Sequence, residues 1–211
     1  MEQSESIGIT RDVVNEYYEA MRYANEYFDE PLKEFIKKYP LQYKHLNAVH
    51  RKRVLINSSV NAMRQLNEKI YFGTLTYDET KDHNSIKIKR REAFTFLNSL
   101  FEFVLLVEEY GEENGRYHVH FVGNFHENKG FDDFVKGWHS RQNIEVVDED
   151  TKVSQYLCKY LSKQLPRIRR NKRLVAFEKY YHHKKGLDKS FPGLFKRDMN
   201  EKIFQLSIFD L

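Results

Sequence analysis

The sequence has little cysteine and no long hydrophobic run. Its only cysteine, Cys158, excludes an internal disulfide bond. No apolar stretch approaches the roughly 20 residues that a transmembrane helix needs, and the opening residues lack the basic and apolar regions of a secretory signal. A glycine-rich lysine motif that would bind nucleotide phosphates is also missing, which argues against ATP hydrolysis. We therefore expect a cytoplasmic protein without a membrane partner.

The composition allows one good-sized hydrophobic core with additions at both ends. The chain has 211 residues, of which 40% are hydrophobic and 15% aromatic. We expect a helical N-terminal extension at residues 1–68, a core domain at 69–166, and a basic segment with a C-terminal tail at 167–211 packed on the core. The extension is predicted to form helices at about 11–38 and 42–69, separated near Pro40. It contains no motif to which we assign a function.

Hydrophobic periodicity after residue 69 predicts the order β-α-β-β-α-β-α. The strands are expected at 70–77, 102–110, 116–124 and 143–148, and the helices at 89–99, 131–139 and 152–164. This order is typical of an α+β domain with an antiparallel or mixed sheet. We expect its helices to pack on one side of the sheet, which leaves the other face able to hold a site.

Two histidines in the third predicted strand are candidate metal ligands. His118 and His120 are two residues apart, so both imidazoles leave the same face of a strand. If Tyr110 faces Tyr117 across the predicted hairpin, Glu109 lies opposite His118 on that face. Two imidazoles and one carboxylate suit Mn²⁺ or Mg²⁺, and the nitrogen ligands favour manganese. The alternative is a pair of hydrogen-bonded strand histidines.

The helix predicted at 152–164 carries tyrosines and lysines beside its apolar stripe. At about 100° per residue, one surface collects four side chains, namely Tyr156, Lys159, Tyr160 and Lys163. Forming a phenolate near pH 7 costs about 4 kcal/mol, and neighbouring cations reduce that cost. The surface therefore suits a tyrosine nucleophile, whereas Cys158 points away from it and is expected to be passive. Alternatively, the tyrosines cover the core edge and the lysines are solvated.

Taken together, three motifs resemble the HUH endonucleases that initiate rolling-circle replication. They are the aromatic strand 71–77, the pair His118-Val119-His120 and the doubled Tyr-x-x-Lys run. The chain is most similar to the two-tyrosine branch of single-stranded DNA phages and some plasmids, over about residues 69–165. The resemblance implies a ferredoxin- or RRM-like sheet with the histidines on a central strand. It also implies that Glu109 is the third metal ligand and that the nucleophile lies on an adjoining helix.

The resemblance implies a metal-dependent enzyme that nicks and rejoins single-stranded or hairpin DNA at an origin. Tyr156 is chosen as the first nucleophile, which leaves a 5′-phosphotyrosine linkage and a free 3′-hydroxyl primer. Tyr160 would attack second, while Lys159 and Lys163 stabilise the phenolates and the phosphate. Such a protein would work with the replication machinery of a bacterial host, and any unwinding would come from a partner.

Positive charge is concentrated in two stretches, although the net charge is only +4. One opens the helix after the first motif, and the other follows the tyrosine run and contains tyrosines suited to stacking on unpaired bases. The predicted DNA-binding residues are Lys87, Lys89, Arg90, Arg91, Arg167, Arg169, Arg170, Lys172, Arg173, Tyr180 and Tyr181. For each of them, a solvated or packed surface position is the alternative.

The last residues resemble the pentapeptide by which bacterial proteins bind the replicative sliding clamp. The segment consists of Gln205, Leu206, Ser207, Ile208 and Phe209, and only Ile208 departs from the usual pattern. Leu206, Ile208 and Phe209 are the expected anchors. The alternative is a final strand docked on the protein's own sheet.

Two other functions use parts of the same pattern. Transposases and conjugative relaxases share the chemistry, but relaxases place the nucleophile before the histidine pair and compact transposases lack the doubled run. A non-catalytic domain that binds single-stranded nucleic acid would instead stack bases on Tyr71, Phe72 and Tyr77. Metal-dependent DNA cleavage distinguishes an enzyme from such a binding domain.

Overall fold

The computed structural model describes residues 9–26, 30–66, 69–77, 85–111, 116–147, 153–159, 161 and 166–184. The elements in these ranges are α1 (Arg11–Glu26), α2 (Glu30–Lys38), α3 (Pro40–Arg64), β1 (Ile70–Thr76), α4 (Ile86–Leu100), β2 (Phe101–Tyr110), β3 (Tyr117–Phe125), α5 (Phe131–Gly137), β4 (Arg141–Val147), α6 (Val153–Lys159), β5 (Ile168–Arg170) and α8 (Lys172–Lys184). None of the helices in this part of the chain combines the length and the apolar character needed to span a bilayer.

The predicted β-α-β-β-α-β-α order is confirmed, with boundaries that differ by at most three residues as far as residue 159. The second half of the last predicted helix, apart from Leu161, lies outside the described residues. Two elements were not predicted. β5 has only three residues, too few to display an alternating pattern, and α8 lies in the segment that was interpreted by its charge.

All five strands form one antiparallel sheet in the order β4-β1-β3-β2-β5. β3 is therefore central, between β1 and β2, as the family resemblance implied for the histidine strand. Each strand in the middle of the sheet is buried on both faces, which accounts for the continuous apolar runs in β2 and β3.

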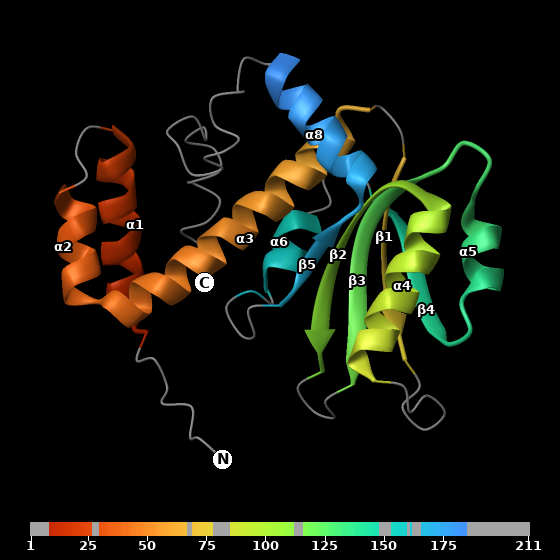
Figure 1. Ribbon diagram of the computed structural model, residues 1–211, viewed down its shortest axis with the longest axis horizontal. Helices are drawn as coiled ribbons and strands as arrows, with labels where there is room; N and C mark the ends of the chain where they lie inside the picture. The colour runs from red at the N-terminus through yellow and green to blue at the C-terminus, as the bar shows by residue number, and fades with distance from the viewer. Residues whose placement is uncertain are drawn as a thin grey trace.

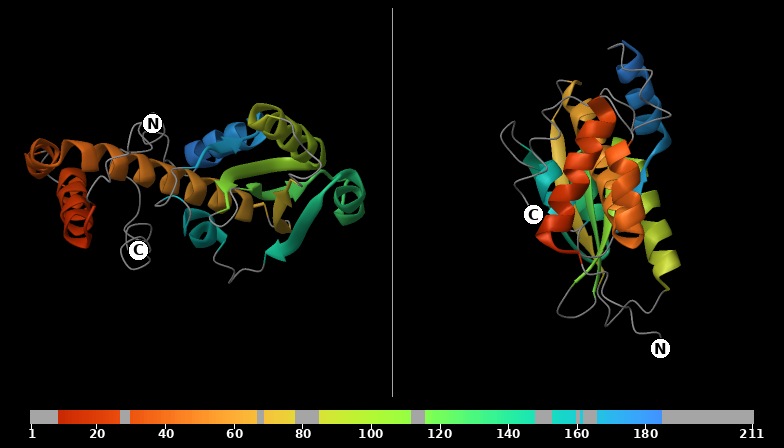
Figure 2. Two further views of the ribbon diagram at one scale, coloured as in Figure 1. Left: turned by 90° about the horizontal axis from the view of Figure 1, so that it is seen from below. Right: turned by 90° about the vertical axis from the view of Figure 1, so that its left-hand side faces the viewer.

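The predicted α+β class is confirmed, but helices cover both faces of the sheet rather than one (Figures 1 and 2). On the first face, α4 and α5 bury side chains that include Leu75, Leu97, Val104, Phe121 and Phe134. On the second face, α3, α6 and α8 bury a set that includes Ile56, Leu105, Val122, Leu157 and Leu174. The correction has a simple cause: alternate residues of β2 and β3 are apolar on both faces, so both need cover.

The N-terminal helices differ from the prediction in one respect. The helix expected at about 11–38 is two helices, α1 and α2, which share a small core where Tyr17 contacts Phe35 edge-to-face at 5.6 Å. Pro40 begins α3, as its fixed φ angle and missing N–H permit at a helix start. α3 continues from this small core, through Leu46, to the sheet, where Ile56 and Val60 are fully buried. It joins the extension to the core domain.

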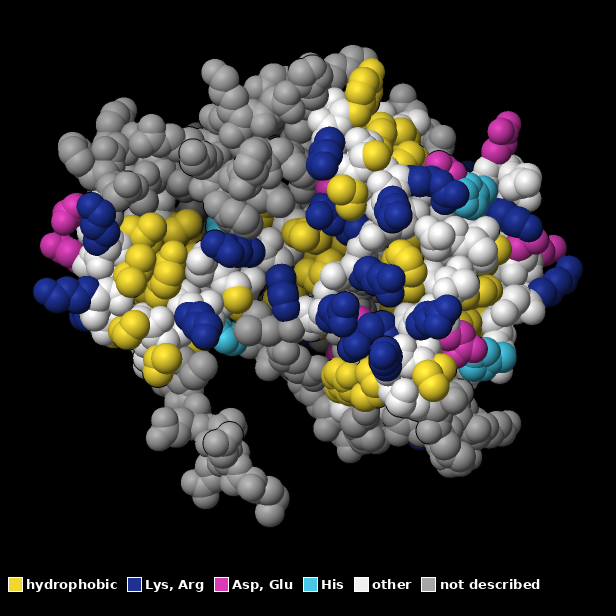
Figure 3. All heavy atoms as spheres, in the orientation of Figure 1, with side chains coloured by type: hydrophobic (Ala, Val, Ile, Leu, Met, Phe, Trp, Pro, Cys, Tyr) yellow, Lys and Arg dark blue, Asp and Glu magenta, His cyan; other side chains and the backbone are white. Residues whose placement is uncertain are grey.

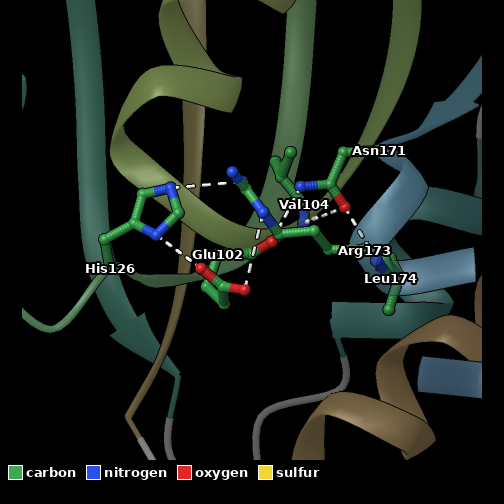
Figure 4. A network of polar contacts seen from close by, with 6 residues as sticks. All are labelled: Glu102, Val104, His126, Asn171, Arg173 and Leu174. Carbon is green, nitrogen blue, oxygen red and sulfur yellow. Dashed lines mark hydrogen bonds and ion pairs between the residues drawn. The ribbon is translucent and has the colours of Figure 1, made fainter. Parts of the chain in front are cut away.

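Asn171, immediately before α8, ties that helix to the beginning of β2 (Figure 4). Its Oδ1 accepts hydrogen bonds from the backbone N–H groups of Leu174, at 2.9 Å, and Val104, at 3.5 Å. Its Nδ2 donates to the backbone carbonyl of Glu102 at 2.8 Å. Since Asn171 is only 1% exposed, water does not compete for these bonds. The side chain caps the helix and fixes it to the sheet at once.

We predict that Asn171→Ala lowers the free energy of unfolding by about 2–4 kcal/mol, because a helix cap and buried backbone partners are lost together. Urea denaturation followed by circular dichroism measures the change. The matched control is Asn128→Ala, at an exposed turn position, which should change stability by less than about 0.5 kcal/mol. Equal effects of the two substitutions would contradict the structural role of Asn171.

Candidate active site

Antiparallel pairing of β2 with β3 brings one carboxylate and two imidazoles to the same face of the sheet. Tyr110 pairs with Tyr117 and Glu109 with His118, which is the predicted register. His120 lies two residues further along β3 and shares that face. Its Nε2 is 2.5 Å from a carboxylate oxygen of Glu109. His120 is buried and His118 is half-buried, so the group lies at the edge of the second core.

β1 contributes two threonines to the same group. Thr74 pairs with His120 and Thr76 with His118 across the sheet. The hydroxyl of Thr74 lies 2.8 Å from Nδ1 of His120, and the hydroxyl of Thr76 lies 3.0 Å from Nδ1 of His118. Sequence reasoning missed both threonines. Their one signal was the two-residue spacing that they share with the histidines.

Tyr156 of α6 lies against the histidine group from the helix side. The centroid of its ring is 5.2 Å from that of Phe72 and 5.8 Å from that of His120, in edge-to-face contacts. The rings of Phe72 and His120 are nearly parallel, with centroids 6.2 Å apart. Tyr156 is 42% exposed, so this side chain borders both the histidine group and solvent. Sequence reasoning also missed the position of Phe72 between the two rings.

α6 is supported from behind by α3. Leu157 is fully buried in the core that α3 covers, and Lys52 of α3 donates to the backbone carbonyl of Pro166 at 2.7 Å. Cys158 is buried in the same core. Burial raises the pKa of its thiol to about 12, against an opposing effect of the cation of Arg53. Cys158 therefore stays a protonated, packed side chain, in keeping with the expected passive role.

Glu109, His118 and His120 fit Mn²⁺ or Mg²⁺ in donor type, since they offer one hard carboxylate and two imidazole nitrogens on one face. In the described ranges, no three His, Cys, Asp or Glu side chains are already gathered as a ready metal centre. Glu109 instead contacts Nε2 of His120 directly. A cation would bind by replacing this contact, because it would share the same oxygen and nitrogen atoms.

Four cations surround the open edge of the sheet beside β5, and we call them the basic edge. They are Lys87, Arg91, Arg167 and Arg169. Lys87, Arg91 and Arg167 are exposed, and the guanidinium of Arg169 lies 3.5 Å from the centroid of the ring of Phe94. Burial lowers the pKa of Arg169, and the nearby charge of Arg167 adds to the shift. Figure 3 shows Lys and Arg side chains gathered over α4 and β5.

The basic edge lies close to the histidine group. The backbone carbonyl of Arg167 accepts a hydrogen bond at 3.0 Å from the N–H of Glu108, the residue before Glu109. β5 then runs antiparallel to β2, away from this end of the sheet. Positive charge is therefore present where a phosphate backbone would approach the histidines.

Other predicted DNA-binding cations have partners inside the fold. Arg90 binds the buried carboxylate of Glu108 at 2.7 Å, on the opposite face of the sheet from Glu109. Arg170 forms an ion pair with Glu178, which is fully buried. Lys89 is only 5% exposed and its ammonium lies over an aromatic ring. These three side chains hold α4, β5 and α8 in place.

The remaining predicted residues lie on α8. Lys172 and Tyr180 are exposed, Tyr181 stacks with Phe177, and Arg173 contacts Glu102 and the ring of His126 (Figure 4). α8 begins beside the start of β2, whereas Glu109 is near the end of that strand. Figure 1 accordingly shows α8 at the far end of the sheet from the histidine group.

Several predicted functional residues lie outside the described residues. They are Tyr160 and Lys163 of the tyrosine run and the pentapeptide at 205–209. Lys159, the last residue of α6 as described, is exposed. The roles assigned to all of these residues stay predictions.

Fold and site together define an α+β domain in which a central strand presents two histidines to a helix-borne tyrosine. Residues 70–165 match the family model of the replication-associated protein ORF2. The match includes β1 to β4 and α6, and covers just under half of the chain. It supports a protein similar to replication initiators, with DNA as its partner. No curated protein matches the chain.

The two neighbouring glutamates should have separable roles. Glu108→Gln should lower the free energy of unfolding by about 2 kcal/mol, because Arg90 loses a buried, charged partner. Glu109→Gln should change stability by less than about 1 kcal/mol but weaken Mn²⁺ binding at least about 10-fold. Denaturation and isothermal titration calorimetry of both variants check this. Equal loss of Mn²⁺ affinity in both would contradict the assignment of Glu109.

Proposed function

We propose that this protein initiates rolling-circle replication by nicking and rejoining single-stranded DNA at an origin. The observation that carries the proposal is the position of the Tyr156 ring beside His120, while Nε2 of His120 meets the carboxylate of Glu109. A nucleophile, two imidazoles and a carboxylate from three separate elements come together at one end of the sheet. The family match over the same residues supports a replication function.

In the proposed reaction, the phenolic oxygen of Tyr156 attacks the phosphorus of a DNA phosphodiester. The phenol gives up its proton, the bond from phosphorus to the 3′-oxygen breaks, and that oxygen takes up a proton as it leaves. The products are a free 3′-hydroxyl and a 5′ end joined to Tyr156, so the phosphodiester energy is retained for rejoining. Glu109, His118 and His120 would hold Mn²⁺ or Mg²⁺, which supplies positive charge to the phosphate oxygens.

The protein's own side chains prepare this step in three ways. Phe72 and His120 fix the ring of Tyr156 from two sides, which limits its rotation before attack. Lys159 lies three positions after Tyr156 on α6, at the spacing where helix side chains are neighbours, and its charge favours the phenolate. Tyr160 and Lys163 would repeat the arrangement one turn later for the rejoining reaction.

Exposure favours this reading over a binding domain that stacks bases on the aromatic strand. Tyr77 is only 1% exposed and contacts Trp138 edge-to-face, and Tyr71 packs on Phe125 in the first core. Phe72 lies between His120 and Tyr156. The three aromatic side chains are thus committed to the fold and the site, whereas stacking on bases needs exposed rings.

We expect incubation with Mn²⁺ and labelled single-stranded origin DNA to give a covalent protein adduct at a 5′ end. Peptide mass spectrometry should place the adduct on Tyr156, and Tyr156→Phe should reduce it below detection because the attacking oxygen is absent. Chelation of the metal and His120→Ala should have the same effect.

Tyr180→Phe is the matched control, since it removes an equally exposed phenol from α8 and should leave the adduct unchanged. An adduct found only on Tyr160 would reverse the order of the two nucleophiles. DNA that binds but is never cleaved, with several metals and the protein's own origin, would favour a non-catalytic binding domain.

The basic edge predicts the salt dependence of DNA binding. Arg91→Gln and Arg167→Gln should each weaken binding of single-stranded DNA and reduce the slope of log K against log salt by about 0.7, because each removes one phosphate contact. Fluorescence anisotropy over a range of salt concentrations measures the slope. Lys37→Gln, exposed on α2, is the matched control and should leave it unchanged. Identical slopes for all three variants would place the DNA elsewhere.

A further inference from the structure

The threonines of β1 form a regular pattern with the histidines of β3. Thr74 and Thr76 are two residues apart, as are His120 and His118, and antiparallel pairing sets each threonine directly opposite one histidine. Each hydroxyl lies within hydrogen-bonding distance of Nδ1 of its own partner, at 2.8 Å and 3.0 Å. One such contact is common between neighbouring strands, but two in succession orient both rings in the same way.

The choice of ring nitrogen matters because the two nitrogens of an imidazole are distinct. A contact at Nδ1 leaves Nε2 as the nitrogen directed away from the threonine, and in His120 that atom meets Glu109. A metal-bound histidine usually forms a hydrogen bond through its second nitrogen, which fixes the orientation of the ring. A hydroxyl suits this position because it both donates and accepts, so it holds an imidazole in either tautomer.

We infer that Thr74 and Thr76 are positioning residues that turn Nε2 of His120 and of His118 toward the Glu109 side of the site. The inference rests on the proposed function, since it takes the two histidines as ligands of a divalent cation. The threonines themselves touch neither the cation nor DNA in this assignment. They act through the rings, and for His120 the parallel ring of Phe72 adds a second restraint.

The test compares four variants, Thr74→Val, Thr76→Val, Thr74→Ser and Thr76→Ser. Valine keeps the branched shape and the preference for β-structure but removes the hydroxyl, whereas serine keeps the hydroxyl and removes the methyl group. Thr95→Val, on the exposed surface of α4, is the matched control. Circular dichroism and thermal unfolding establish that each variant is folded.

Two readouts do not depend on nicking. Long-range ¹H–¹⁵N spectra of the metal-free protein report the state of each histidine ring, and titration calorimetry reports the affinity for Mn²⁺ alone. Thr74→Val should shift the ring signals of His120, and Thr76→Val those of His118. Each valine variant should bind Mn²⁺ about 10- to 100-fold more weakly, with the serine variants close to the unaltered protein.

The outcomes separate this inference from the proposed function. Unchanged ring signals and Mn²⁺ affinity within twofold in both valine variants would overturn the inference, whatever the nicking activity. Absence of Mn²⁺ binding by the unaltered protein would also overturn it. If Mn²⁺ binds, the valine variants weaken it and no DNA is nicked, the positioning role stands and the proposed function fails.

Discussion

The antiparallel register of β1, β3 and β2 is the constraint that places every residue of the site. It sets His118 opposite both Glu109 and Thr76, and His120 opposite Thr74. A slip of one residue would exchange the two histidines for apolar neighbours that face the other core. Because both faces of these strands bury apolar side chains, the hydrophobic effect opposes any such slip. Two apolar cores thereby fix the positions of polar groups.

Cover on both faces of the sheet also links the N-terminal helices to the tyrosine helix. α3 begins in the small core of α1 and α2 and ends over the sheet, where its buried residues support α6. Displacing α3 would expose Leu157 and Val60 together, and would loosen the helix that carries Tyr156. The extension, for which the sequence offered no motif, is thus continuous in packing with the site.

Burial divides similar charged residues between the fold and the surface. Glu108 and Glu109 are adjacent, yet alternation sends one to Arg90 beneath α4 and the other to His120. Among the arginines, Arg170 is committed to a buried carboxylate while Arg91 and Arg167 remain exposed. Removing a buried partner leaves an uncompensated charge, whereas an exposed cation is available to bind phosphate.

The amino-acid sequence alone was enough to predict the order of strands and helices from 70 to 159, the hairpin register and the face shared by Glu109, His118 and His120. These features follow from local periodicity and a short connection, which need no distant partner. The folded chain was needed to see that α3 covers the second face, that Thr74 and Thr76 meet the histidines, and which cations are buried. These contacts join residues more than 40 positions apart, and a pattern along one strand or helix does not specify which distant element packs against it.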